Sequence, residues 1–401
     1  MRIVTCYFAA VGLALHIGVI LAVFLAPELV EKASHHMRVF LDGGDQPAPV
    51  LPGVVGLTEE IAQTLAPWEA LASTGTAGPG EIRVAGRLYA SLKEAAANLQ
   101  DNETLVLGEG IYSEPLLIRA NDVTIVGDGH AILEGVAHRG KAAIVARGDN
   151  VAIANLECRG VKVADRNGAC VRFQGKNLTL SHVYFHDSEQ GVLATRNSGV
   201  VQVLDSRFER LGAAGRAHGI YAGGEKLYIL RSGFIAMHEG SHAIKSRARE
   251  TVIDSSLITS LSARTGRLLD LSNGGVLHLR NSVLAQGPNV DNSDIIGFGL
   301  EGDLHETAGV NISGNLILLE RLGASRLMRS GTGAPTPVIR GNVIIGGQHL
   351  DAGEGNYIFA SRQEAGLPPY PRVPAVEQVP GGLPLPAQQA TEVRGHPMPD
   401  E

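Results

Sequence analysis

The sequence of 401 residues has few aromatic residues: nine Phe, eight Tyr and a single Trp. Its three cysteines are too few for a scaffold held together by disulfides, and their spacing fits no metal-binding motif. The formal net charge of −7 argues against a general nucleic-acid-binding protein, which needs a basic surface. Glycine, by contrast, occurs 50 times. Many tight turns and few large core side chains favour a fold of short repeated strands over a helical bundle or a Rossmann-type sheet.

The N-terminal segment lacks charged side chains, since residues 3–26 contain no Asp, Glu, Lys or Arg. A helix of this length spans roughly 36 Å, enough to cross a hydrocarbon core of about 30 Å. A cleaved signal peptide would need a small-x-small site, and Phe24 and Pro27 make a poor one. We therefore predict an uncleaved transmembrane anchor at residues 1–26. Arg2 on the short flank favours a single-pass inner-membrane protein whose main domain lies in the periplasm.

Composition divides the rest of the chain into three parts. Residues 27–80 are predicted to be a stalk or linker, because Pro- and Gly-rich stretches surround one short helical pattern at 57–72. Residues 366–401 are rich in proline and are predicted to be a disordered tail. The segment between them, residues 81–365, is therefore predicted to be the folded domain.

The predicted folded domain repeats about every 25 residues. The apolar residues that open the repeated β-rich segments are Ile153, Leu180, Val203, Ile229, Ile253, Leu279, Ile312 and Ile339. Three positions later, from the third repeat onward, come Ser206, Ser232, Ser256, Ser282, Asn315 and Asn342. In a parallel β-solenoid, inward side chains stack about 4.8 Å apart on successive coils, and buried Ser or Asn residues form a ladder. The period-two alternation within each segment argues against helical repeats, so we expect a β-solenoid.

The stretch ASLKEAAANLQDNETLVLGEGIYSEPLLIRANDVTIVGD, residues 90–128, precedes these repeats. It resembles the capping helix and first coil of pectate-lyase-like right-handed parallel β-helix proteins, and the resemblance continues over roughly 270 residues. The resemblance implies an all-β fold, a single-stranded right-handed parallel β-helix with an N-terminal capping helix, preceded here by the transmembrane helix. This superfamily contains lyases, hydrolases, epimerases and noncatalytic proteins, so the resemblance implies a fold and not an activity.

A second set of strands precedes the Ser and Asn positions and carries two rows of polar side chains. Because side chains alternate along a strand, the residue after each inward position faces outward. These outward positions are Arg172, Leu193, Tyr221, Lys245, Asp270 and Gly297. The leading edge of the same strands holds Gln190, His218, His242, Arg267 and Asp294. Successive coils lie about 5 Å apart, so we expect the polar members to form one patch. Pectate-lyase-like proteins hold their polysaccharide beside the corresponding strand.

An acidic, uronate-containing polysaccharide is the substrate that fits this patch best. A protein of net negative charge needs a local basic strip to bind such a chain. Cations beside the carboxylate also stabilise the charge that develops when the neighbouring carbon loses its proton. We therefore predict a lyase acting by β-elimination, or an epimerase acting by a related C5 proton abstraction. The predicted catalytic residues are Lys245, Tyr221, His218, His242 and Asp270, and the predicted substrate-binding residues are Arg172, Arg196, Arg247, Arg267, Asn273 and Glu301.

Within this set, Lys245 is the expected base, because like charges from nearby arginines favour its neutral form. Tyr221, with a neighbouring histidine, is the expected proton donor to the departing glycosidic oxygen. The stretch 242–274 is similar to the lysine motif of the chondroitinase-B-like and alginate lyase branch, and the Lys-Ser pair that begins at Lys245 implies the same base role. Ser272 and Asn273 stand where that branch has Arg and His, so a different arginine must neutralise the carboxylate.

Two other functions remain open from the sequence. A glycoside hydrolase needs two carboxylates, which Asp270, Asp294 and Glu301 could supply, but the Asn-Thr-Asp and Asp-Asp pattern of polygalacturonases is absent. The other alternative is a noncatalytic glycan-binding or scaffold protein of an exopolysaccharide system. The sequence indicates no oligomeric state.

No cofactor is predicted. The Asn- and Asp-rich segment 287–294 is interpreted as a loop extension and not as a Ca²⁺ site, because it lacks an acidic cluster. Cys158 and Cys170 could form a disulfide in an oxidising periplasm, although a separation of 12 residues does not decide this.

Overall fold

The computed structural model describes residues 55–347, 353, 355–374 and 391–392. The predicted transmembrane anchor at residues 1–26 lies outside these residues. Within the described residues, no helix is long and apolar enough to cross a membrane.

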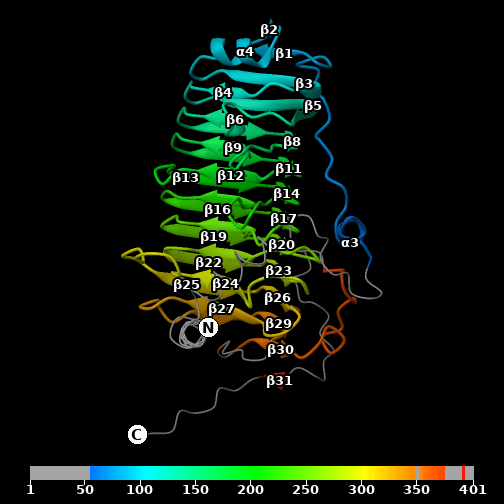
Figure 1. Cartoon of the computed structure of the whole chain (residues 1–401), viewed down its shortest axis with the longest axis vertical. Coiled ribbons are helices and arrows are strands. Elements are labelled where there is room, and N and C mark those ends of the chain that lie inside the picture. The colour runs from blue at the N-terminus through cyan, green and yellow to red at the C-terminus, as the bar shows by residue number, and fades with distance from the viewer. Residues whose placement is uncertain (1–54, 348–352, 354, 375–390, 393–401) are drawn as a thin grey trace, which may run out of the picture. The chain divides into compact units, whose positions relative to one another are not determined.

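The described chain forms a parallel β-solenoid of the right-handed type with about nine turns, seen as a stack of coils in Figure 1. Each turn contributes one strand to a nine-stranded sheet, whose neighbouring strands pair in parallel. Along the stack these strands are β4 (Leu116–Ile118), β6 (Ala142–Ala146), β9 (Ala169–Phe173), β12 (Gln190–Ala194), β15 (Ile220–Ala222), β18 (Ile244–Ser246), β21 (Leu269–Leu271), β24 (Asp294–Phe298) and β27 (Arg326–Ser330).

The remaining strands form a 22-stranded sheet, to which most turns contribute two strands separated by a bend. The first row comprises β7 (Val151–Ala154), β10 (Leu178–Ser181), β13 (Val200–Leu204), β16 (Lys226–Leu230), β19 (Glu250–Asp254), β22 (Val276–Arg280), β25 (Gly309–Ser313) and β28 (Val338–Arg340). The second row comprises β8 (Glu157–Arg159), β11 (Tyr184–His186), β14 (Arg207–Glu209), β17 (Gly233–Ile235), β20 (Leu257–Thr259), β23 (Val283–Gln286), β26 (Leu316–Leu319), β29 (Val343–Gly346) and β30 (Tyr357–Phe359).

At the N-terminal end of this sheet, the long strands β3 (Thr104–Tyr112) and β5 (Thr124–Glu134) pair in parallel, and β5 pairs with both β7 and β8. Three pairings are antiparallel: β1 (Ile82–Val84) with β2 (Arg87–Tyr89), β1 with β3, and β30 with β31 (Thr391–Glu392). All other named strand pairs in the described chain are parallel. The predicted parallel β-helix is therefore confirmed by the topology.

The predicted register is confirmed residue by residue. The eight opening residues from Ile153 to Ile339 are direct partners on successive first-row strands. The Ser and Asn ladder also forms, because each backbone N–H donates to the side-chain oxygen of the next coil, at 3.1 Å from Ser206 to Ser232 and 3.0 Å from Asn315 to Asn342. Asn356 extends the ladder by one further step. Buried polar side chains thus fix the bend of each coil.

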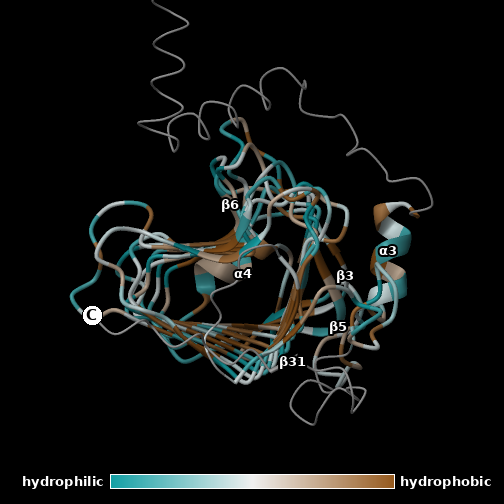
Figure 2. Cartoon of the chain, turned by 90° about the horizontal axis from the view of Figure 1, so that it is seen from below, coloured by the Kyte–Doolittle hydropathy of each residue, from teal (hydrophilic) through white to brown (hydrophobic). Residues whose placement is uncertain are grey.

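The interior of the solenoid is apolar and contains small aromatic stacks. Figure 2, a view along the coils, shows apolar residues concentrated on the strands and polar residues in the loops. Phe185, Phe208 and Phe234 lie on successive coils: Phe185 meets Phe208 edge to face with ring centroids 5.5 Å apart, and Phe208 stacks on Phe234 at 4.6 Å. A few aromatic residues in register therefore suffice, which agrees with the low aromatic content.

Helix α4 (Leu92–Asn98) lies at the N-terminal end of the stack (Figure 1). Ser91 caps it by accepting a hydrogen bond from the backbone N–H of Glu94 at 3.1 Å. Leu92 and Ala95 on one face of the helix are buried in the main core cluster. The apolar face of the helix therefore packs into the main core.

The part of the predicted stalk that is described, residues 55–80, packs along the solenoid. Helix α3 (Leu57–Thr64) buries Ile61 against Ile235 and Leu261. Further along, Asp128 on β5 accepts hydrogen bonds from the backbone of this segment, including one from Ala77 N–H at 2.8 Å. The composition indicates extended backbone, but it does not reveal that side chains of the solenoid hold that backbone in place.

The beginning of the predicted tail, residues 366–374, also packs against the solenoid. Leu367 and Val373 lie against a second-row core cluster, and the hydroxyl of Tyr370 donates to Glu60 at 3.1 Å. Apart from β31, the rest of the predicted tail lies outside the described residues. A disulfide joins Cys158 on β8 to Cys170 on β9.

Candidate functional site

The nine-stranded sheet brings the predicted outward row together. Tyr221 on β15 pairs in register with Lys245 on β18, and Lys245 pairs with Asp270 on β21. On the N-terminal side the row continues through Leu193 to Arg172. Residues far apart in the sequence are therefore neighbours on successive coils, as the repeat predicts.

Two depressions beside these strands share Arg196 and Arg247 and join into one groove. Four arginines line this arginine groove: Arg172, Arg196, Arg247 and Arg249. Tyr221 forms part of its wall, whereas Lys245, Asp270 and the two histidines do not line it. The groove runs from β9 to the loop after β24, five coil spacings or roughly 24 Å.

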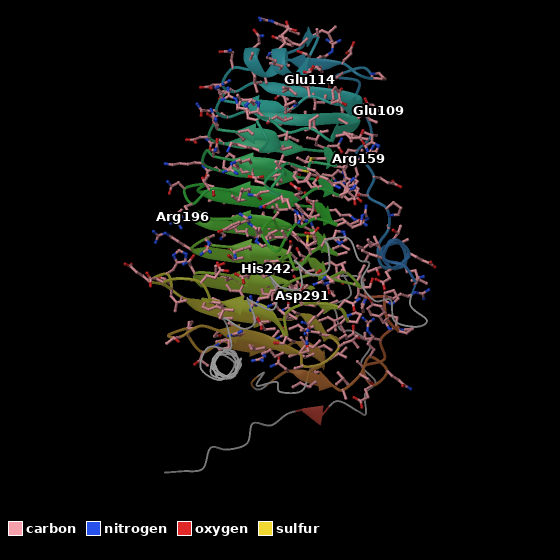
Figure 3. The ribbon with its side chains drawn as sticks, viewed as in Figure 1. Glu109, Glu114, Arg159, Arg196, His242 and Asp291 are labelled. Carbon is pink, nitrogen blue, oxygen red and sulfur yellow. A yellow bond between two sulfur atoms is a disulfide. The ribbon has the colours of Figure 1, made fainter. Side chains whose placement is uncertain are left out.

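Arg172 and Arg196 differ from the other arginines of the groove, because neither side chain has a hydrogen bond or ion pair to any described residue. The Nε atom of Arg172 is buried without a partner. Arg196 is exposed, and Figure 3 shows its label at the edge of the coils. Arg249 forms an exposed pair with Glu225 at 3.3 Å. The groove therefore holds two cations whose charge no neighbouring carboxylate balances.

Arg247 organises the centre of the groove. Its Nε donates to the hydroxyl oxygen of Tyr221 at 2.7 Å, and its Nη1 donates to the side-chain oxygen of Asn273 at 2.6 Å. Its Nη2 donates to Glu301. Burial opposes the charge of Arg247, but the hydrogen bond from Arg247 to Tyr221 and the charge of Glu301 raise its pKa. Arg247 therefore holds a phenol, an amide and a carboxylate in one fixed arrangement.

Lys245 lies beneath the groove and is only 8% exposed. Its Nζ donates to the other carboxylate oxygen of Glu301 at 2.8 Å. It also lies 5.7 Å from the ring centre of Tyr221, close enough for a cation–π interaction. The predicted base is thus engaged with a carboxylate and does not line the groove.

The two predicted histidines form a ladder at the leading edge of the strands. Their rings stack with centroids 5.0 Å apart. Nδ1 of His218 accepts from the backbone N–H of His242 at 3.0 Å, and Nδ1 of His242 accepts from that of Arg267 at 2.9 Å. Burial, together with the charges of His242 and Lys245, lowers the pKa of His218 well below its usual value. His218 is therefore a neutral, buried residue that supports the strand edge.

Asp270, Asp294 and Arg267 form a buried ion-pair network instead of lining the groove. Asp270 is 1% exposed and accepts from Ser272 at 2.7 Å and from Arg267 at 3.2 Å. Arg267 also donates to Asp294. His242 Nε2 lies 3.5 Å from Asp270. The positive charge of Arg267, predicted to bind substrate, is therefore already balanced by two buried carboxylates.

Some groove residues were not predicted from the sequence. Arg249 and His305 line the second depression, and His305 Nε2 donates to the backbone oxygen of Arg247 at 3.2 Å. Arg249 lies two positions after Arg247, so the alternation of side chains is a signal that could have found it. His305 lies in the loop after β24, where the repeat is longer and no periodic signal exists.

Among the described residues, no group of three or more His, Cys, Asp and Glu side chains is arranged to hold a metal ion. The segment 287–294, interpreted above as a loop extension, is held by hydrogen bonds within the protein. Asn289 donates to the backbone of Ser262 at 2.8 Å, and Asp291 pairs with Arg264 at 3.5 Å.

Comparisons with known proteins give distant likenesses. No protein-family model matches the chain, and no curated protein matches it. Among solved structures, it is similar to an alginate lyase from Paenibacillus sp. str. FPU-7, with 16% identity over 67% of this chain and 93% of that chain and a TM-score of 0.46. It is also similar to a PL6 alginate lyase in complex with a trisaccharide (18% identity, 77% of this chain, 66% of that chain, TM-score 0.43). The pectate lyase Pel9A has 13% identity over 61% of this chain and 72% of that chain, with a TM-score of 0.41. The strand register, and not these likenesses, establishes the parallel β-helix.

Proposed function

We propose that this chain binds an acidic, uronate-containing polysaccharide along the arginine groove and cleaves it by β-elimination. The observation that carries the proposal is the pair of unbalanced cations, Arg172 and Arg196, beside Tyr221 in an open groove. The chain as a whole has a net charge of −7 and repels a polyanion, so a local excess of cations is a specific feature. Guanidinium groups also suit carboxylates, which they bind through two parallel hydrogen bonds.

Tyr221 is the residue that we assign to proton transfer. It is the ionisable group, other than arginine, that lines the first depression of the groove. Arg247 donates to its hydroxyl oxygen at 2.7 Å, and Lys245 lies 5.7 Å from its ring centre. Negative charge that develops on this oxygen is therefore stabilised by two fixed cations. This assignment gives Tyr221 the base role that the sequence pattern predicts for Lys245, because Tyr221 lines the groove and Lys245 does not.

The proposed elimination needs no co-reactant besides the polysaccharide. In the reactive form, in which Tyr221 has given its hydroxyl proton to solvent, the Tyr221 oxygen accepts the proton from the carbon next to the uronate carboxylate. The electron pair of that C–H bond forms a carbon–carbon double bond, and the neighbouring C–O bond breaks with its electron pair on the glycosidic oxygen. That oxygen then takes the proton from Tyr221, which restores the phenolate. Arg172 and Arg196 hold the carboxylate, where they stabilise the charge of the intermediate state.

The test is turnover by the full-length chain. Alginate, pectate, glycosaminoglycans and bacterial acidic polysaccharides are incubated with the protein, and the unsaturated uronate product is detected by its near-ultraviolet absorbance. We expect turnover on at least one of them, with Tyr221→Phe slower by about 10²- to 10⁴-fold and binding retained. Tyr228→Phe is the matched control, because Tyr228 lies on β16 in the first row of the other sheet.

Other outcomes decide between the alternatives. Binding without turnover on every polysaccharide would favour the noncatalytic glycan-binding or scaffold function. New reducing ends without the absorbing product would indicate a hydrolase, although two of the candidate carboxylates, Asp270 and Asp294, are buried and paired with Arg267. The proposal is refuted if the chain neither binds nor cleaves any of these polysaccharides.

The cellular setting of this function rests on the sequence. We propose that residues 1–26 anchor the chain in the inner membrane and that the solenoid acts in the periplasm. We also propose that α4 caps the solenoid. Labelling of Lys176, an exposed residue of the solenoid, by a membrane-impermeant amine reagent in cells with a permeabilised outer membrane tests the orientation.

A further inference from the structure

We infer that the carboxylate of Glu301 occupies the position of a substrate carboxylate, and that an acidic sugar must displace it in order to bind. The inference rests on the proposed function and adds to it a residue that selects acidic over neutral sugars. Glu301 lies in the loop after β24 and contacts two cations. One carboxylate oxygen accepts from Lys245 at 2.8 Å, and the other accepts from Arg247.

The exposure of the three side chains indicates which group can leave. The side chain of Glu301 is 35% exposed, whereas those of Lys245 and Arg247 are 10% and 20% exposed. The carboxylate is therefore the most accessible of the three groups, and both cations are more buried than it. An entering carboxylate would meet the same two donors.

The backbone around Glu301 allows the side chain to move without unfolding the loop. The backbone of Glu301 is held on both sides, since its N–H donates to Ser272 at 2.9 Å and its carbonyl accepts from Asn273 at 3.2 Å. These bonds do not involve the carboxylate. Rotation about the side-chain bonds alone would carry the carboxylate away from the cations and leave the loop in place.

Displacement makes the site selective through charge. Removing Glu301 from its cradle leaves two mostly buried cations without a counter-ion, which is strongly unfavourable. A uronate carboxylate restores the balance, but a neutral sugar does not. The tethered carboxylate also competes with the ligand, so the observed affinity for uronates is lower than that of the open cradle. Glu301 therefore reduces the affinity for all ligands and rejects neutral ones most strongly.

The test compares two variants of the same loop that change the net charge equally. Glu301→Gln removes the competing carboxylate, whereas Glu306→Gln removes an exposed carboxylate that contacts neither Lys245 nor Arg247. Binding of oligogalacturonate and of alginate oligosaccharides to the full-length chain is measured by calorimetry at fixed ionic strength. We expect Glu301→Gln to bind about tenfold more tightly than the wild type, and Glu306→Gln to bind as the wild type does. Glu301→Asp, with a shorter side chain, should give a smaller gain, provided that its thermal unfolding matches that of the wild type.

The outcomes separate this inference from the proposed function. If the wild type binds these oligosaccharides and Glu301→Gln binds them equally or more weakly, Glu301 only orders the groove and the inference is wrong. The same conclusion follows if Glu306→Gln gains as much affinity as Glu301→Gln, because the effect is then one of net charge. If neither the wild type nor Glu301→Gln binds any acidic oligosaccharide, the proposed function fails and the inference fails with it.

Discussion

Two clusters of charged side chains lie on different faces of the solenoid. Their compositions are similar, but one balances its charges with ion pairs and the other contains arginines without a partner among the described residues. The arginine groove lies beside the nine-stranded sheet. The second cluster, here called the paired cluster, lies on the outer face of the second row and consists of Glu157, Arg159, Tyr184, His186, Asp187, Arg207, Glu209 and Arg210. Figure 3 labels one arginine of each, Arg196 and Arg159, on opposite sides of the view.

In the paired cluster, each charge is balanced by a neighbour. Glu157 accepts from His186 and Arg159, both at 3.1 Å. His186 also contacts Asp187 at 2.6 Å through its other ring nitrogen. The ring of Trp68, from the segment that precedes the solenoid, stacks on Tyr184 with centroids 5.6 Å apart. This cluster therefore contributes to docking the N-terminal segment and has no unbalanced charge to offer a ligand.

The comparison of the two clusters shows that residue types alone do not identify a binding site. Both clusters contain arginine, carboxylate, tyrosine and histidine, and the paired cluster has more residues of the kind found in active sites. Only the groove combines an open surface with cations that lack a partner. Pairing and access, which depend on three-dimensional contacts, separate the structural cluster from the candidate site.

The largest effect is expected from breaking the paired cluster. Glu209 is 1% exposed and forms ion pairs with Arg207 and Arg210. Glu209→Ala leaves two partly buried cations without their shared carboxylate, so the free energy of unfolding should fall by about 3–5 kcal/mol. Urea unfolding measures this loss. The control is Glu250→Ala, which removes a half-exposed pair with Lys226 and should cost at most about 1 kcal/mol.

An equal, small effect in both variants would contradict the comparison, because the paired cluster would then be no more than a set of surface ion pairs. A loss of polysaccharide affinity in Glu209→Ala, measured where the protein is still folded, would also contradict it. The paired cluster would in that case take part in binding.

A substitution in the arginine groove should weaken binding and leave the stability of the fold unchanged. Arg196 has no partner in the described chain, so Arg196→Ala should leave the free energy of unfolding unchanged. It should weaken binding of an acidic oligosaccharide by about tenfold or more, because a hydrogen bond between charged groups contributes about 1.5–3 kcal/mol. Arg340→Ala, which removes an exposed arginine on β28, is the charge-matched control and should have little effect on binding. If both variants lose affinity equally, binding depends on net charge and not on the groove.

Much of the fold was predictable because the solenoid repeats its register in the sequence. The alignment of Ile153 with its counterparts and the Ser and Asn ladder follow from positions that recur at each coil. The row from Arg172 to Asp270 was predictable for the same reason. These features depend on spacing along strands, which the sequence records directly.

The pairing of these residues was not predictable. Glu301 reaches Lys245 and Arg247 from a loop whose length breaks the repeat, and nothing in the sequence indicates which cations it contacts. For the same reason, Arg267 was predicted to bind substrate although two buried aspartates balance it. The contact of the segment around Trp68 with the solenoid was not predictable either, because contacts between an extended segment and a distant face leave no periodic signal.

The smallest effect expected is a difference in pH dependence between one histidine of each face. Burial alone would lower the pKa of His186, but its hydrogen bonds to Asp187 and Glu157 outweigh burial and raise the pKa. Burial, with the charges of His242 and Lys245, lowers the pKa of His218. The usual value in an unfolded chain is about 6.5. His186 is therefore protonated more readily in the folded protein than in the unfolded chain, whereas His218 is protonated less readily.

The two histidines therefore change the free energy of unfolding with pH in opposite directions. The stabilisation from His186 is fully present below about pH 6.5 and is lost as the pH rises through its folded pKa. For His218, the unfolded chain binds the proton more readily, so stability is lost as the pH falls below about 6.5. Each slope is at most about 1.4 kcal/mol per pH unit. Urea unfolding at several pH values should show that the wild type loses its advantage over His186→Gln as the pH rises. Its advantage over His218→Gln should shrink as the pH falls. Parallel curves for both variants would mean that His186 and His218 change their proton affinity on folding in the same direction, and the two faces would not differ in this respect.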